Sequence, residues 1–205
     1  MNSKDKKFRS TFLSGLRWSA IKRVGQAVLS IVVTIIMARL LDPSDFGLVA
    51  MATVFTGISN VFTELGTGEA LIRKKNPNNE FISSIFWLNT GLAIVVCVIL
   101  AIIAPFVAKL YDQEIVEILI YVLSIEILLS GINRVSHALL EKNMRFKAIA
   151  FAQIVSQICG AAIGISMAFL GYGLWSLVIL GISGQFIYTI IVNIALKWVP
   201  KLKFN

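Results

Sequence analysis

The chain has 205 residues, of which 57% are hydrophobic and 15% are charged, and its mean hydropathy is +0.82. Soluble domains are usually about 45–50% apolar and about 25% charged, so this composition excludes a soluble domain and indicates an integral membrane protein. The net charge of +8 does not indicate a nucleic-acid partner, because the cations lie in short segments between apolar runs, as in the loops that orient membrane proteins.

Residues 1–17 mix cations with large apolar side chains. The cations are Lys4, Lys6, Lys7, Arg9 and Arg17, and the apolar residues are Phe8, Phe12, Leu13 and Leu16. A cytoplasmic amphipathic segment, with a short helix lying on the membrane surface, fits this pattern. A charged terminus without fixed structure fits it equally well.

Six apolar runs follow, each near the ~20 residues that cross ~30 Å of hydrocarbon. They predict transmembrane helices at residues 20–41, 46–68, 82–108, 115–140, 148–170 and 174–198. Residues 18–199 are therefore expected to form an all-α integral membrane bundle of six transmembrane helices, and residues 200–205 to begin a cytoplasmic linker.

The placement of the cations predicts the orientation of this bundle. If the N-terminus lies in the cytoplasm, sixteen Lys and Arg residues fall on the cytoplasmic side, and only Arg39 and Lys109 fall on the outer side. Cationic loops stay in the cytoplasm when membrane proteins insert. Both termini are therefore expected to be cytoplasmic.

Polar residues inside the predicted helices fall on narrow faces at ~100° per residue. One stripe holds Ser19, Arg23, Gln26, Ser30 and Thr34 in the first helix, a second holds Thr53, Gly57, Asn60, Glu64 and Gly68, and the stripe in the fourth helix holds Glu126, Ser130, Asn133, Arg134, His137 and Glu141. An ionisable group at mid-membrane costs ~2.5–3.5 kcal/mol on insertion scales. The fourth helix is therefore expected to border a hydrated cavity or substrate path. An internal ion pair between Glu126 and a cation of another helix is the alternative.

Other charged residues have less distinctive positions. His137 and Glu141 lie close to the predicted cytoplasmic interface, where they could line the cavity or reach out to water. Glu64 is expected to face the cavity. Glu69 and Arg73 are spaced i, i+4 with the acid first, which predicts a local ion pair.

Small residues recur in the last two predicted helices, as Gly160, Gly164, Gly181 and Gly184. Their spacing predicts close approach of these helices, and a hinge that permits motion is the alternative. One histidine, two separated cysteines and no glycine-rich phosphate loop leave no conventional catalytic set, so an enzyme is not expected.

Several stretches resemble the Wzx-type exporters of the multidrug/oligosaccharidyl-lipid/polysaccharide exporter superfamily, above all its colanic-acid and teichuronic-acid branch. They are residues 38–42 (ARLLD), 45–48 (DFGL), 64–66 (ELG), 70–74 (ALIRK), 86–92 (FWLNTGL), 138–142 (ALLEK) with 146–147 (FK), and 171–177 (GYGLWSL). Their order and spacing over residues 14–199 carry the resemblance.

The resemblance implies a flippase in the bacterial inner membrane. Such a protein moves an undecaprenyl-diphosphate-linked oligosaccharide repeat unit across the membrane by alternating access. The implied fold is a two-lobe transporter of the MATE type, of which this chain is similar to the first lobe. No cofactor is implied, while coupling to a proton or sodium gradient is left open.

The resemblance also implies partners, namely the lipid-linked oligosaccharide, membrane lipids, and the polysaccharide polymerase with its chain-length machinery. The alternatives are an exporter of drugs or lipid II, an integral-membrane enzyme of polysaccharide assembly such as a polymerase, and a scaffold that moves no lipid. Family members have about twelve to fourteen helices, so a fragment lacking its second lobe is expected, with a homodimer as the alternative.

Two arguments supply the candidate substrate-binding or cavity-lining residues. The matching motifs give Arg39, Glu64 and Arg73, and the polar stripes give Asn60, Glu126, Asn133, Arg134 and His137.

Overall fold

The computed structural model describes residues 23–63, 67–74 and 77–196, and all regular structure within these ranges is helical. The helices are Arg23–Leu40, α2 (Pro43–Thr63), α3 (Thr67–Arg73), α4 (Asn79–Tyr111), α5 (Glu114–Lys142), α6 (Phe146–Phe169) and α7 (Leu174–Leu196). The predicted amphipathic segment at 1–17 and the predicted linker at 200–205 lie outside the described residues.

Five of the described helices are long and apolar enough to cross a membrane, namely Arg23–Leu40, α4, α5, α6 and α7. The apolar stretch counted in α2, Pro43–Ile58, is shorter. The protein is therefore an all-α integral membrane protein, and the sixth span stays a prediction. Where one helix is predicted at 46–68, the structure has two, α2 and α3. Gly66 and Gly68 fall in the sequence at this junction, and glycine is the weakest helix former after proline.

Local chemistry explains several helix ends. Pro43 opens α2, at a position where its missing N–H leaves no intrahelical bond unmade. Asn78 caps α4 by accepting a hydrogen bond from the Phe81 backbone N–H at 3.2 Å. Between α6 and α7, Gly171 and Gly173 have positive φ angles of 81° and 51°, which glycine adopts without a Cβ penalty.

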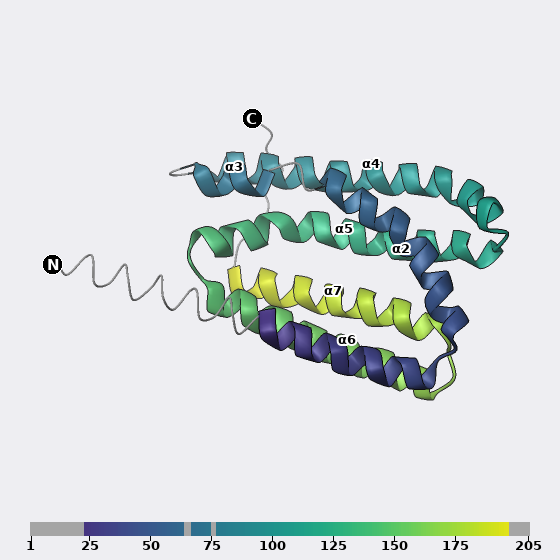
Figure 1. Ribbon diagram of the computed structural model, residues 1–205. Coiled ribbons are helices and arrows are strands. Elements are labelled where there is room, and N and C mark those ends of the chain that lie inside the picture. The colour runs from purple at the N-terminus through teal and green to yellow at the C-terminus, as the bar shows by residue number, and fades with distance from the viewer. Residues whose placement is uncertain (1–22, 64–66, 75–76, 197–205) are drawn as a thin grey trace.

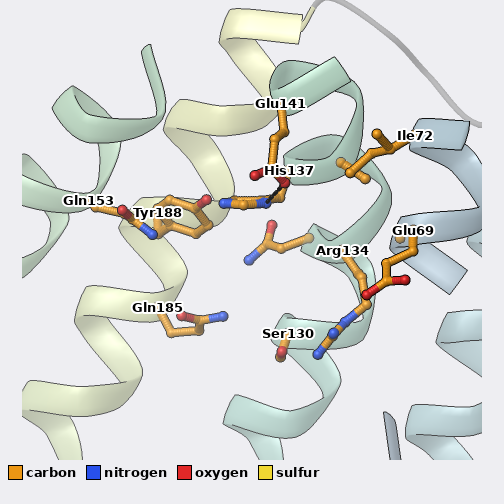
Figure 2. Close-up of a pocket in the computed structure, with 12 residues that line it drawn as sticks. Glu69, Ile72, Ser130, Arg134, His137, Glu141, Gln153, Gln185 and Tyr188 are labelled. Atoms are coloured by element: carbon orange, nitrogen blue, oxygen red, sulfur yellow. Dashed lines mark ion pairs between the residues drawn. The ribbon is translucent and has the colours of Figure 1, made fainter. Parts of the chain in front are cut away.

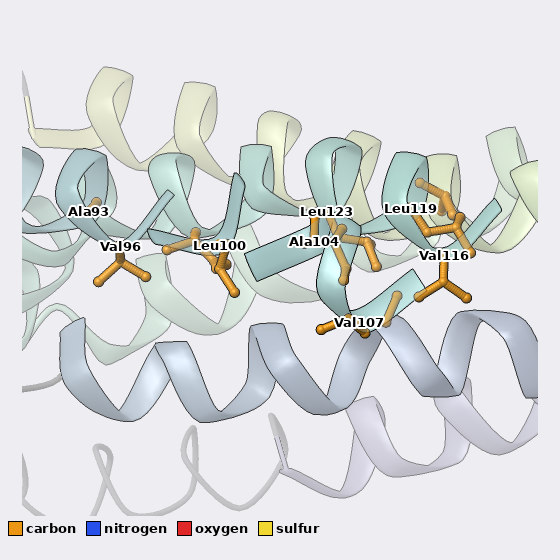
Figure 3. Packing of buried hydrophobic residues seen from close by; sticks show 12 residues of the cluster. Ala93, Val96, Leu100, Ala104, Val107, Val116, Leu119 and Leu123 are labelled. Carbon is orange, nitrogen blue, oxygen red and sulfur yellow. The ribbon is translucent and has the colours of Figure 1, made fainter. Parts of the chain in front are cut away.

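Helices α4 and α5 pack along their lengths through a dry apolar core (Figure 3). Its buried members include Ala93, Val96, Leu100, Ala104 and Val107 from α4, and Val116, Leu119, Ile120, Leu123 and Ile127 from α5. Gly131 allows the closest approach, because a Cβ there would lie 2.7 Å from the Ala93 Cβ. This rigid pair holds the polar stripe of α5 in place.

Helices α6 and α7 approach each other even more closely. A Cβ on Gly160 would lie 2.8 Å from the Leu180 carbonyl oxygen, and one on Gly164 would lie 2.9 Å from the Ser176 carbonyl oxygen. The Gly184 Cα also lies against Gly160. The predicted close packing through small residues is confirmed for these glycines, and Gly181 instead faces Glu126 of α5.

Figure 1 shows α3 and α4 along one side of the bundle, α5 and α7 in the middle, and α6 with the helix Arg23–Leu40 along the other side. Helix α2 crosses obliquely and packs on α4, α5 and α7. The end at which α5 ends and α6 begins is called the basic end here. Its described cations are Arg73, Lys74, Lys142, Arg145 and Lys147. The opposite end, called the acidic end, carries Asp42, Asp45, Asp112 and Glu114.

Candidate functional site

A chain of three hollows runs from the basic end of the bundle toward the acidic end. The charged hollow has a volume of about 510 Å³ and lies among α3, α5, α6 and α7. The amide hollow, of about 590 Å³, lies among the helix Arg23–Leu40, α6 and α7. A smaller, apolar hollow of about 160 Å³ continues between the helix Arg23–Leu40 and α7.

Neighbouring hollows share lining residues, so they lie next to one another, and the three together are called the groove here. Gln153, Gln185 and Tyr188 line both the charged and the amide hollow. Ser30, Gln157 and Leu180 line both the amide and the apolar hollow. The character of the lining therefore changes along the groove, from charged to amide-rich to apolar.

The charged hollow takes most of its polar lining from one face of α5. Ser130, Asn133, Arg134, His137 and Glu141 recur every three or four residues, which places their side chains on a single helical face. Figure 2 shows the His137 ring pointing toward Tyr188 of α7, while the Arg134 side chain points toward Ser130. The His137 Nδ1 lies 3.9 Å from the Glu141 Oε2.

Two hydrogen bonds fix this face of α5 against α7. The Asn133 Nδ2 donates to the Thr189 Oγ1 at 2.7 Å, and the Ser136 Oγ donates to the Asn193 Oδ1 at 2.9 Å. Each donor residue is buried. Polar contacts of this kind hold membrane helices together, and here they join α5 to α7.

Helix α3 forms the remaining wall of the charged hollow. Gly68, Glu69 and Ile72 line it, and the Lys142 ammonium of α5 secures the end of α3 by donating to the carbonyl oxygens of Leu71 and Lys74. The predicted ion pair between Glu69 and Arg73 is confirmed, with 3.6 Å between the Glu69 Oε2 and the Arg73 Nη2. The i, i+4 spacing predicted only this structural role for Glu69, and its place in the wall was not predicted.

The structure brings some of the candidate residues together and separates others. Asn133, Arg134 and His137 all line the charged hollow. Glu126 lines none of the three hollows and faces Gly181 of α7, where a Cβ would collide with its carboxylate. Arg39 is exposed on its helix and lines none of the three hollows.

Three further candidates come from α2, α3 and the residues between them. The side chain of Arg73 is 83% exposed and outside the charged hollow. Asn60 falls within α2, but its side chain lies outside the described residues, as does Glu64 altogether. The roles of these residues stay predictions.

The amide hollow was not predicted, although part of its signal was present in the sequence. Gln26 and Ser30 belong to the polar stripe of the first helix, and both line it. Gln153 and Gln157 are spaced i, i+4 in an otherwise apolar α6, a spacing that places both on one face. This glutamine pair is the sequence feature that indicates the amide hollow.

Several polar atoms along the groove make no hydrogen bond to the described chain. They are the Oδ1 of Asn133, the Oε1 of Gln153, the Oε1 of Gln157 and the Oη of Tyr188. Leaving a buried polar group unpaired costs about 1–3 kcal/mol. The presence of such atoms is easier to explain if the groove binds a polar ligand than if it only packs helices together.

Among the described residues, no cluster of His, Cys, Asp and Glu could hold a metal ion.

Comparisons with known proteins identify the family. A family model described as "Polysaccharide biosynthesis protein" matches residues 36–205. The chain belongs to the polysaccharide biosynthesis protein family. The resemblance to polysaccharide exporters inferred from the sequence motifs is thereby confirmed.

Named relatives of this polysaccharide biosynthesis family member are bacterial. The succinoglycan biosynthesis transport protein ExoT of Rhizobium meliloti is 30% identical over 82% of this chain and 34% of its own. The lipopolysaccharide biosynthesis protein WzxC of Escherichia coli is 26% identical over 74% of this chain and 31% of its own. The teichuronic acid biosynthesis protein TuaB of Bacillus subtilis is 27% identical over 94% of this chain and 40% of its own.

The chain therefore spans about a third of the length of the curated relatives it matches. No solved structure matches the chain. Family membership together with the apolar helices identifies a multi-pass inner-membrane protein.

Proposed function

We propose that this chain forms one lobe of a flippase, which moves an undecaprenyl-diphosphate-linked oligosaccharide across the bacterial inner membrane by alternating access. The observation that carries the proposal is the groove of three hollows, which share lining residues from one to the next. A relative of this chain is named as a transport protein of polysaccharide biosynthesis, which supports the same passenger class.

The proposed topology has six spans in a MATE-type lobe, with the basic end and both termini in the cytoplasm. Sixteen cations on one side against two on the other support this orientation. The charged hollow then opens to the cytoplasmic leaflet, where a lipid-linked saccharide would enter. Arg134 supplies a cationic group for a diphosphate, since bidentate guanidinium contacts favour this anion, and the His137 ring can donate a hydrogen bond.

The proposed protein is a transporter and not an enzyme. It would lower the free-energy barrier for moving the sugar and diphosphate across the hydrocarbon region of the membrane, without making or breaking a covalent bond. Energy could come from a proton or sodium gradient across the membrane, and no cofactor is required. The lipid-linked oligosaccharide and membrane lipids are the proposed partners, with a polysaccharide polymerase and chain-length machinery acting afterwards.

The proposal predicts where the lipid-linked repeat unit accumulates when the gene is deleted. Without a flippase, single repeat units should collect on the cytoplasmic leaflet, so a sugar-oxidising or lectin probe should reach them in inverted vesicles and not in intact spheroplasts. A strain complemented with the intact gene is the control.

Other outcomes would contradict the proposal. Single repeat units accumulating on the outer leaflet would indicate a lost polymerase. Normal repeat-unit levels together with accumulated lipid II or retained drug would assign a different passenger.

A further inference from the structure

The amide hollow differs in chemistry from the charged hollow beside it. Its polar lining consists of amides from Gln26, Gln153, Gln157 and Gln185 and hydroxyls from Ser30, Ser156 and Tyr188. None of the described residues that line it carries a formal charge. The cations and carboxylates of the groove lie in the charged hollow, so the two hollows suit different parts of a ligand.

The hollow lies deep within the predicted membrane thickness. Gln153 and Gln157 are about 10 Å and about 16 Å along α6 from its first residue, Phe146, at 1.5 Å per residue. On the α7 side, Gly181 and Gly184 line it and leave the helix backbone without side-chain cover. Four glutamines gathered at this depth are costly unless a partner satisfies them.

The hydrogen-bonding capacity of these amides is largely unused. A glutamine can donate two hydrogen bonds and accept two. Within the described part of the chain, the Gln157 Nε2 donates to the Gln26 backbone oxygen at 3.3 Å, while its Oε1 accepts nothing. The Oε1 of Gln153 and the Oη of Tyr188 are buried and also make no hydrogen bond to any described residue.

A purely structural role for the amides does not account for this pattern. Between α5 and α7, two pairs of polar side chains bond each other directly, Asn133 with Thr189 and Ser136 with Asn193. The glutamines of the amide hollow form no such side-chain pair within the described residues. A bound cation is not favoured either, because no carboxylate among the described residues lines this hollow.

We propose that the amide hollow is a subsite for the neutral, polyhydroxylated saccharide portion of the passenger, while the charged hollow receives its diphosphate. Sugar hydroxyls donate and accept hydrogen bonds, as glutamine amides do, and they would use the unpaired oxygens of Gln153 and Gln157. A volume of about 590 Å³ lies within the range of small-molecule sites. This inference rests on the proposed function and adds to it a division of labour along the groove.

The test compares two lipids on the intact protein in nanodiscs, with binding measured by native mass spectrometry. One probe is bare undecaprenyl diphosphate, and the other is undecaprenyl diphosphate carrying the repeat-unit oligosaccharide. The variant Gln26→Leu/Gln157→Leu should weaken binding of the sugar-bearing lipid about 10-fold and leave binding of the bare lipid unchanged, because both residues line the amide hollow and neither lines the charged hollow. Gln113→Leu, an exposed amide at the acidic end, is the matched control and should change neither affinity.

The outcomes test the saccharide subsite and the flippase proposal separately. Equal loss of both lipids in the double variant, or loss of neither, would overturn the saccharide subsite while the flippase proposal stands. Failure of the unaltered protein to bind either lipid would instead remove the proposed function. Unchanged affinity for the bare lipid also shows that the double variant is folded. The milder variant Gln26→Asn/Gln157→Asn retains the amides and should lose less affinity for the sugar-bearing lipid.

Discussion

Replacing Arg134 by alanine in the intact protein is expected to reduce surface polysaccharide at least about 10-fold. Arg134 lies on the α5 face that lines the charged hollow, and its guanidinium is the one described arginine side chain in that lining. Charge-assisted hydrogen bonds to a phosphate contribute about 1.5–3 kcal/mol each, and a single such loss lowers an equilibrium constant about 10-fold or more. The measurement is surface polysaccharide per cell at matched amounts of membrane-inserted protein.

Two variants control this experiment. Arg134→Lys keeps the charge without the bidentate geometry and should retain part of the export. Lys109→Ala removes an exposed cation at the acidic end, away from the hollows, and should export normally. Normal polysaccharide in Arg134→Ala would remove this residue from the mechanism.

Substituting valine for Gly164 or Gly160 is expected to destabilise the bundle by about 3 kcal/mol. At Gly164 the new Cβ would lie 2.5 Å from the Leu180 Cβ and 2.9 Å from the Ser176 carbonyl oxygen. Because one of these atoms belongs to the backbone of α7, a change of rotamer cannot relieve the contact. The helices α6 and α7 would have to separate, which would open the amide hollow between them and the helix Arg23–Leu40.

The measurement is the fraction of monodisperse protein that survives heating in detergent. Gly91→Val in α4 is the matched control, because a Cβ at Gly91 meets no atom within 4 Å. Equal thermal stability of Gly164→Val and Gly91→Val would contradict the close packing of α6 on α7.

The helical membrane architecture was predictable because long apolar runs leave few alternatives to transmembrane helices. The polar face of α5 was also predictable, because Asn133, Arg134 and His137 are polar residues at helical spacing in a helix that is otherwise rich in leucine and isoleucine. The close approach at Gly160 and Gly164 follows from residue size alone. These features depend on local sequence, which a single chain displays directly.

Other features depend on which helices become neighbours, and sequence periodicity does not supply this. Glu126 shares a stripe with Arg134, yet it packs against Gly181 of α7 and lines none of the three hollows. Glu69 forms its predicted local pair and also walls the charged hollow, because Lys142 holds α3 against α5. The amide hollow is lined by three helices. The glutamines of α6 line a hollow only because the helix Arg23–Leu40 and α7 pack beside them, and this packing cannot be read from the sequence of α6.

The central claim is that polar side chains of several helices line one hydrated groove that is reached from the cytoplasm. Cysteine accessibility tests it most directly, after Cys97 and Cys159 have been replaced by alanine. Ser130→Cys and Gln153→Cys should react with a membrane-impermeant maleimide in inverted vesicles and not in intact cells, while Ile102→Cys on the exposed apolar face of α4 should react in neither. If the cysteines at 130 and 153 are as unreactive as the one at 102, or react only from outside, the groove is not an entry path from the cytoplasm.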